Sequence, residues 1–192
     1  MNLLARMLAT VCITALAVSA IADGASASVF TASATGTIAG AQTTNQVFTT
    51  SSGGSNIVTC KKALTIGSIT SLASAEQHIT VEYAECTFAI SGFGTNPATV
   101  SPATYLLTAN GEVHIKNTIT ISVPVLGCST TVSPQSRKSL SYANISGKLQ
   151  VTSSITSISS KGSGFCPGGT TGTFSGSNLL ERVGGGTFSW DA

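Results

Sequence analysis

The stretch that most constrains the fold is a predicted hairpin unit with the sequence YLLTANGEVHIKNTITISVPVLGC, residues 105–128. Its Asn110-Gly111 pair separates two runs of strand-forming residues, and this dipeptide is a strong signal for a tight turn between antiparallel strands. A two-residue turn pairs Ala109 with Glu112 and predicts a three-stranded antiparallel meander with one apolar face. That face carries Leu106, Thr108, Val113, Ile115, Ile119, Ile121, Val123 and Val125, and the opposite face carries Tyr105, Leu107, Glu112, His114 and Lys116.

The remaining segments follow the same alternating pattern. Residues 78–84 alternate cleanly, with Ile79, Val81 and Tyr83 facing the core. A phase shift at Ala84-Glu85 predicts a bulge, and Ser146-Gly147 predicts a second hairpin. The segment 71–77 is too short for a free helix and is expected to form a turn or a single helical turn. Ten or more short strands at regular spacing predict an all-β fold, an antiparallel sandwich or flattened barrel. The similar segments 35–40 and 171–176 are expected to lie on neighbouring strands.

The first 27 residues have the three parts of a secretory signal peptide. Met1 to Met7 contain one basic residue and no acidic one, an apolar run follows, and Ala25-Ser26-Ala27 provides small residues for cleavage after Ala27. Cleavage after Ala20 is the alternative. We therefore expect a secreted or cell-surface protein with a single all-β domain over residues 28–192 and no integral membrane segment.

Composition argues against two classes of partner. Charged residues make up 8% of the chain and its net charge is +2. A charge this small, without a basic cluster, argues against binding to nucleic acid or to an anionic membrane. The expected partner is an unknown protein or surface.

Four cysteines remain after removal of the signal peptide, and an even number in an exported protein predicts disulfides. Sequence alone allows three connectivities. The preferred pairing is Cys60–Cys86 and Cys128–Cys166, because a meander would bring these segments together. A metal site is disfavoured, since the spacing contains neither a C-x-x-C pair nor nearby histidines.

No catalytic, cofactor-binding or metal site is predicted. His114 shares a strand face with Glu112, and an enzyme would require a third polar group to join them in a pocket; a surface ladder of cross-strand neighbours is the preferred interpretation. The only aspartate after the signal is Asp191, and no G-x-S-x-G motif is present. The single tryptophan, Trp190, is expected to anchor the core. Asn144-Ile145-Ser146 matches a glycosylation acceptor triplet.

The placement of the cysteines, the segment TITISVPVLGC (residues 118–128), the opening FTASATGTI and the closing GGGTFSWDA resemble a group of uncharacterised exported bacterial proteins. These proteins have a signal peptide followed by one Ser/Thr/Gly-rich β-domain with two cysteine pairs. The resemblance covers essentially the whole mature chain. It implies secretion and a β-fold, and it carries no activity or site residues.

The function expected from the sequence is that of a non-enzymatic structural, adhesion or interaction module of unknown ligand. Two alternatives remain: a carrier of a small apolar ligand with a cleft between its sheets, and a pilin-like subunit completed by a neighbour's strand. Functional residues are expected in the loops 92–102 and 161–171, because rigid β-frameworks commonly display function there.

Overall fold

The computed structural model describes residues 27–50, 56–90, 92, 94–166 and 171–192. Nearly all of the predicted signal peptide, residues 1–26, lies outside them. Sixteen strands and one 3-10 turn make up the described chain. The elements are β1 (Val29–Ala32), β2 (Gly36–Thr50), β3 (Asn56–Ile69), β4 (Ala73–Ser74), β5 (Glu76–Ile90), β6 (Gly94–Val100), β7 (Ala103–Thr108), β8 (Glu112–Ile115), β9 (Ile119–Val123), η1 (Pro124–Leu126), β10 (Cys128–Val132), β11 (Gln135–Lys138), β12 (Leu140–Ile145), β13 (Lys148–Ile158), β14 (Ser160–Ser163), β15 (Gly172–Arg182) and β16 (Phe188–Asp191).

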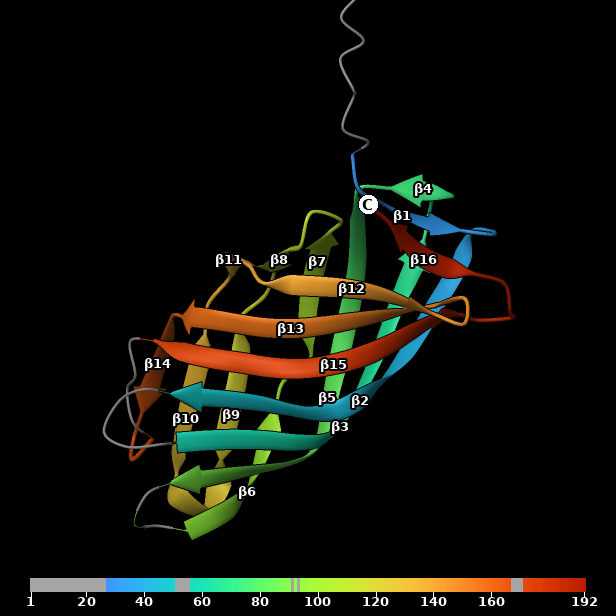
Figure 1. Ribbon diagram of the computed structural model, residues 1–192. Coiled ribbons are helices and arrows are strands. Elements are labelled where there is room, and N and C mark those ends of the chain that lie inside the picture. Colours follow the sequence, from blue (N-terminus) through green and yellow to red (C-terminus); the bar gives the residue numbers. More distant parts are fainter. Residues whose placement is uncertain (1–26, 51–55, 91, 93, 167–170) are drawn as a thin grey trace, which may run out of the picture.

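The strands form two layers that face each other across an apolar core. Strands β12, β13, β15, β2, β3 and β5 pair in that order. From the second half of β5 the sheet continues through β6, β9, β10 and β14. The first half of β5 pairs with β7, and from there the sheet continues to β8 and β11. Strands β13, β15 and β2 cross the front of the molecule in Figure 1, and β7, β9 and β10 run steeply behind them. The expected all-β antiparallel fold of many strands, a sandwich or flattened barrel, is confirmed.

The long central strands change direction where their inward-facing pattern shifts. Along β3, Cys60 and Ala63 are both buried, and Lys61 and Lys62 between them are exposed. On the paired strand β5, Glu85 has a positive φ of 51°. The shift predicted at Ala84-Glu85 is therefore present, and it lets one strand contribute to both layers.

A small sheet closes one end of the sandwich. Strand β1 pairs with β16 and with β4, so the first and last described strands are neighbours. Phe30 and Phe188 point into the core with 2% and 1% of their surface exposed. The ring of Phe30 makes an edge-on contact with Tyr142 of β12, with 5.2 Å between ring centroids. These aromatic contacts attach the end sheet to the main layers.

The hairpin at Asn110-Gly111 forms, but its predicted register is wrong by one residue. Tyr105 pairs with Ile115 and Leu107 pairs with Val113, so three residues rather than two form the loop. Gly111 has φ of 88° and donates its N–H to the carbonyl of Thr108. Because a slip of one residue exchanges the two faces of a strand, Leu107 and Tyr105 point inward on β7.

The third strand of the predicted meander does not pair with the second. Strand β9 pairs with β6 and β10 instead of β8. Ile119, Ile121 and Val123 are buried as predicted, but Val125 lies in η1 with 73% of its surface exposed.

Several other predictions can be compared directly with the strands. The hairpin at Ser146-Gly147 is confirmed, with positive φ at both residues. Strands β2 and β15, which contain most of the two similar segments, are neighbours. The predicted loop 92–102 is largely strand β6, and the segment 71–77 forms bends, β4 and the start of β5. In the predicted loop 161–171, residues 167–170 lie outside the described part.

Candidate functional site

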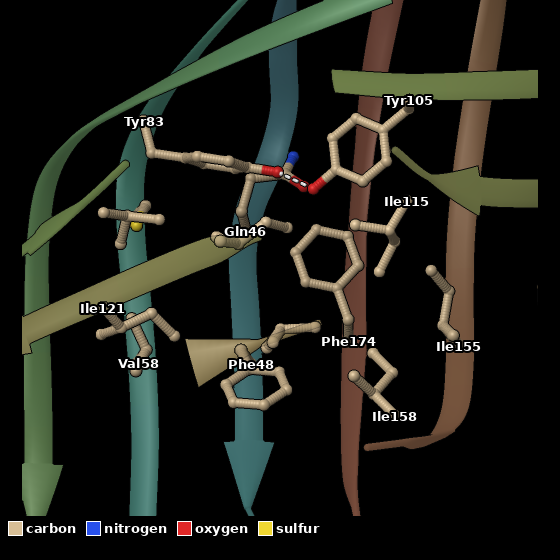
Figure 2. A pocket seen from close by; sticks show the side chains of 14 residues that line it. Gln46, Phe48, Val58, Tyr83, Tyr105, Ile115, Ile121, Ile155, Ile158 and Phe174 are labelled. Atoms are coloured by element: carbon tan, nitrogen blue, oxygen red, sulfur yellow. Dashed lines mark hydrogen bonds between the residues drawn. The ribbon is translucent and has the colours of Figure 1, made fainter. Parts of the chain in front are cut away.

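The interior between the two layers contains a small apolar cavity of about 60 Å³ (Figure 2). Its walls come from both layers and consist mainly of aliphatic and phenylalanine side chains, together with Gln46, Tyr83 and Tyr105. A second space of about 30 Å³ lies beside it and shares Gln46, both tyrosines, Ile155 and Phe174 as lining. Ligand pockets for drug-sized molecules measure about 300–1,000 Å³. The core is therefore too well filled for a lipid-sized ligand.

Gln46 and the two tyrosines of this interior are bonded to protein partners, whereas the buried Oδ1 of Asn178, which lines the second space, has none among the described residues. The hydroxyl groups of Tyr83 and Tyr105 point toward one another at 2.7 Å (Figure 2). Gln46 donates its amide N–H groups to the carbonyls of Thr44 and Ser177, both at 3.3 Å. Burial raises the pKa of both tyrosines, and that of Tyr105 reaches about 12. Neither phenol is therefore suited to act as a base near neutral pH.

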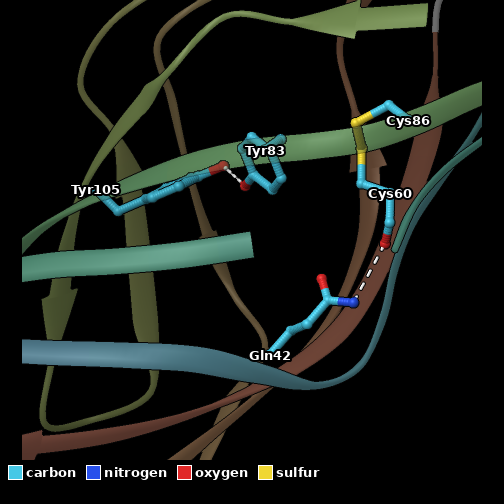
Figure 3. The surroundings of a disulfide bond; sticks show 5 residues. All are labelled: Gln42, Cys60, Tyr83, Cys86 and Tyr105. Atoms are coloured by element: carbon cyan, nitrogen blue, oxygen red, sulfur yellow. Dashed lines mark hydrogen bonds between the residues drawn. A yellow bond between two sulfur atoms is a disulfide. The ribbon is translucent and has the colours of Figure 1, made fainter. Parts of the chain in front are cut away.

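Both predicted disulfides are present. Cys60 and Cys86 face each other on paired strands β3 and β5, with 4.0 Å between their Cα atoms (Figure 3). Gln42 donates a long hydrogen bond of 3.5 Å to the carbonyl of Cys60. Cys128–Cys166 ties the start of β10 to the segment after β14. The two bonds are consistent with an oxidising extracellular environment, and they occupy every thiol of residues 28–192.

The predicted polar ladder on β8 acquires a third member. His114 Nδ1 lies 2.5 Å from the hydroxyl of Ser136, its cross-strand neighbour on β11. Glu112 lies on the other side of the ring, with its carboxylate 3.9 Å from Nε2. A carboxylate, an imidazole and a hydroxyl thus occur together, as in a nucleophilic triad, but the Glu112–His114 distance exceeds a hydrogen bond. None of these three side chains borders either of the two interior cavities. They are also absent from the lining of two surface hollows, one beside His78 and one beside Trp190.

Other groups with metal or acid–base chemistry lie apart. His78 is on β5 and borders a shallow surface hollow of about 260 Å³ together with Ile66 and Thr104. Among the described residues, no three His, Cys, Asp or Glu side chains gather closely enough to hold a metal ion. The same part of the chain contains no helix with the length and apolar character needed to cross a membrane.

The most complete surface site is a hollow of about 290 Å³. It lies at the end of the sandwich where Figure 1 shows β1 and β16. Four separate parts of the chain form it: the residues just before β1, the turn between β7 and β8, strand β12 and strand β16. We call it the end hollow. It is lined by Ser28, Ala109, Asn110, Gly111, Leu140, Ser141, Tyr142 and Trp190.

Hydrogen bonds hold the aromatic wall of the end hollow in place. Trp190 donates its indole N–H to the carbonyl of Ala109 at 2.8 Å, and Tyr142 donates its hydroxyl to the carbonyl of Thr108 at 2.7 Å. The two rings are 5.6 Å apart. Asn144 exchanges two hydrogen bonds with the backbone of Trp190. The wall is therefore fixed to the hairpin turn before any ligand arrives.

Polar groups of the opposite wall remain accessible. Asn110 uses its side-chain oxygen to accept hydrogen bonds from Thr108 and from the backbone of Glu112. This leaves the Nδ2 donors of Asn110 without a described protein acceptor. Ser141 is exposed and Ser28 is half-buried, and both carry a hydroxyl at the hollow. The end hollow thus combines a rigid aromatic surface with a few hydrogen-bonding groups, the usual composition of a ligand site.

Sequence reasoning did not identify this site. It placed Trp190 in the core, and the ring does pack against buried residues, but it is only half-buried and also faces the hollow. The Asn110-Gly111 pair predicts a turn and gives no signal for a binding site. No local signal connects Ser28, Asn110, Ser141 and Trp190, because they meet only when distant strands pair.

No known protein family, curated protein or solved structure matches the chain.

Proposed function

We propose that this chain is a secreted or cell-surface, non-enzymatic β-sandwich that acts as an adhesion or interaction module. The observation that carries the proposal is the end hollow, which presents Trp190 and Tyr142 beside Asn110 and Ser141 on a rigid frame. Half-buried aromatic rings next to accessible donors and acceptors are typical of binding surfaces. The hollow would hold part of a ligand on another protein or on a surface.

Export is supported by the predicted signal peptide together with the two disulfides. Disulfides persist in oxidising compartments and are rare in the cytosol. The weak charge of the chain favours an uncharged partner over nucleic acid.

The arrangement around His114 supports a non-enzymatic role. In a hydrolytic triad the carboxylate orients the histidine by a hydrogen bond, and donors for a developing oxyanion face the same reacting atom. Here Glu112 is 3.9 Å from the ring and the three side chains lie on a strand surface. A polar ladder that stabilises the pairing of β8 with β11 accounts for these contacts.

The two alternatives receive less support. A carrier of a lipid-sized molecule needs a far larger interior than about 60 Å³. A pilin-like subunit needs a gap for a donated strand. In the described sheet, β13, β15, β2, β3, β5, β6, β9 and β10 each pair on both sides.

The test measures retention on the producing cells. The purified protein, labelled with a fluorophore, is incubated with intact cells and with isolated cell envelopes, and the retained fraction is measured. Ser141→Tyr fills the end hollow, and we expect it to lower retention by about tenfold or more. Ser175→Tyr places the same side chain on another exposed strand serine, on β15, and should leave retention unchanged. Equal retention of the wild type and Ser141→Tyr would refute the proposal.

A further inference from the structure

We propose that the end hollow binds a single neutral sugar residue, such as one unit of an extracellular glycan. This inference rests on the proposed binding function and specifies the class of ligand. The aromatic wall, the uncommitted polar groups, the size of the hollow and the charge around it support it.

The aromatic wall suits the C–H face of a sugar ring. A pyranose presents several weakly positive C–H bonds on one face, and the electron-rich face of an indole attracts them. Trp190 is half-buried, and its N–H is already bonded to the carbonyl of Ala109. The indole therefore offers its ring rather than its polar atom. Because Asn144 and Tyr142 also hold this segment, little side-chain freedom is lost on binding.

The polar groups suit the hydroxyls of a sugar. Asn110 offers Nδ2 donors, and the hydroxyls of Ser141 and Ser28 can each donate and accept. A sugar hydroxyl also does both, so these groups can pair with it without leaving a charge unpaired. The volume of about 290 Å³ lies near the lower end of the range for small-molecule pockets, and it accommodates one sugar ring rather than a chain of several.

The charges around the end hollow are balanced. Its lining contains no lysine, arginine or histidine side chain. The acidic residues Glu112 and Asp191 follow Gly111 and Trp190 in the chain. They are offset by Lys138, the register partner of Glu112, and by the amino group that Ser28 would acquire on cleavage after Ala27. The hollow therefore has no side-chain cation built to pair with an anion, and a neutral sugar suits it.

Trp190 makes the experiment direct, because it is the only tryptophan of the chain and lies in the site. The purified, disulfide-bonded protein is titrated separately with glucose, galactose, mannose and N-acetylglucosamine, and with glucuronate as the anionic comparison. We expect at least one neutral sugar to change the tryptophan emission along a saturable curve, with a dissociation constant on the order of 1 mM. Glucuronate should bind no more tightly than the best neutral sugar, because no cationic side chain lines the hollow.

Variants connect the signal to the hollow. Ser141→Tyr should weaken binding by about tenfold or more, and Ser175→Tyr should not change it. Ser28→Tyr narrows the hollow from a different segment and serves if Ser141→Tyr fails to fold, which far-ultraviolet circular dichroism would reveal. The inference is overturned if no neutral sugar changes the emission at concentrations about a hundredfold above the expected constant, or if glucuronate binds best. If Ser141→Tyr lowers retention on cells but no sugar changes the emission of Trp190, the proposed binding function is supported and the sugar ligand is refuted.

Discussion

Tyr83 and Tyr105 place a polar contact inside a largely apolar core. Their hydroxyl groups share a hydrogen bond of 2.7 Å between side chains of the neighbouring strands β5 and β7. Removal from water raises the pKa of both phenols, since the ionised form is poorly solvated there. For Tyr105 the bond to Tyr83 opposes this effect in part, and its pKa is about 12. Tyr142 also has a raised pKa, caused by burial.

These pKa values predict a loss of stability in alkaline solution. An unfolded tyrosine ionises near pH 10, whereas the folded protein keeps the protons of Tyr83 and Tyr105 to higher pH. The stabilisation is therefore complete below about pH 10 and is lost as the pH rises toward 12, at up to about 1.4 kcal/mol per pH unit for each tyrosine. Urea unfolding at a series of pH values measures it.

The double variant Tyr83→Phe with Tyr105→Phe provides the comparison. It should show a shallower decline of the unfolding free energy above about pH 10, because only Tyr142 still contributes. All three tyrosines of the chain have raised pKa values, so native protein should show little tyrosinate absorbance at pH 10. Parallel declines in the two proteins would contradict this account.

Asn144 acts as a clamp for the last strand. Its side chain donates to the carbonyl of Trp190 at 2.8 Å and accepts from the N–H of Trp190 at 2.9 Å. Asn144→Ala should destabilise the protein by about 1–2 kcal/mol and shift the emission of Trp190 toward that of a solvated indole. Asn45→Ala, at an exposed asparagine of β2, is the control in both urea unfolding and fluorescence. An unchanged Trp190 spectrum in Asn144→Ala would show that the clamp is not needed.

Short-range patterns predict single residues well where one physical effect dominates. Alternation placed Ile79 and Val81 in the core, and the parity of the cysteines predicted that they pair. The dual position of Trp190 was not predictable, because it depends on Ala109 and Asn144 from other strands. Asn144 begins a glycosylation triplet, but both polar atoms of its side chain are hydrogen-bonded to the backbone of Trp190. The triplet alone is therefore weak support for an asparagine that is free to accept a glycan.

At the scale of elements, the hairpin of β7 and β8 shows how a correct turn can carry a wrong register. Asn110-Gly111 favours a two-residue turn, but the observed loop of three residues places only Gly111 at a positive φ. The longer loop buries Leu107 opposite Val113, with 3% and 2% of their surfaces exposed. Burial of two large side chains outweighs the local preference of one dipeptide, since each contributes roughly 1.5–3 kcal/mol.

The two disulfides allow a prediction of how much each bond contributes to the free energy of unfolding. Cys60–Cys86 closes a separation of 26 residues between β3 and β5, and Cys128–Cys166 closes one of 38 residues. Loop entropy then gives each bond about 3–4 kcal/mol. Cys60→Ala with Cys86→Ala, and Cys128→Ala with Cys166→Ala, should each lower the unfolding free energy by that amount in urea. A loss below about 1 kcal/mol for either pair would show that the entropic account fails there.

At the scale of the whole molecule, the order of strands in the sheet could not be predicted from the sequence. Alternation and turn residues identify strands, and composition identifies the all-β class. Neither specifies that β2 lies between β3 and β15, or that β5 is shared by two layers. Those choices depend on pairings between distant segments, whose total burial decides among many arrangements with similar local patterns. The end hollow depends on the same pairings and was hidden for the same reason.

The pairing of the chain's two ends predicts slow folding. Strand β2 pairs with β15, and Phe48 lies opposite Phe174 although they are far apart in sequence. Forming such contacts requires closure of a long loop before any burial compensates for it. The purified protein with intact disulfides should therefore refold over milliseconds to seconds, which stopped-flow fluorescence of Trp190 can follow.

A circular permutant tests whether this closure limits the rate. Val29 and Asp191 are register partners, so residues 28 and 192 can be joined by a short glycine linker, with new ends opened beside Pro134 in the exposed connection between β10 and β11. In the permutant, roughly a few tens of residues separate β15 from β2 along the chain, and we expect refolding to accelerate by about tenfold. The permutant keeps the same strand pairs, so urea unfolding at equilibrium identifies any accompanying change in stability. A permutant of equal stability that refolds no faster would place the limiting step elsewhere, in the joining of the two layers through β5.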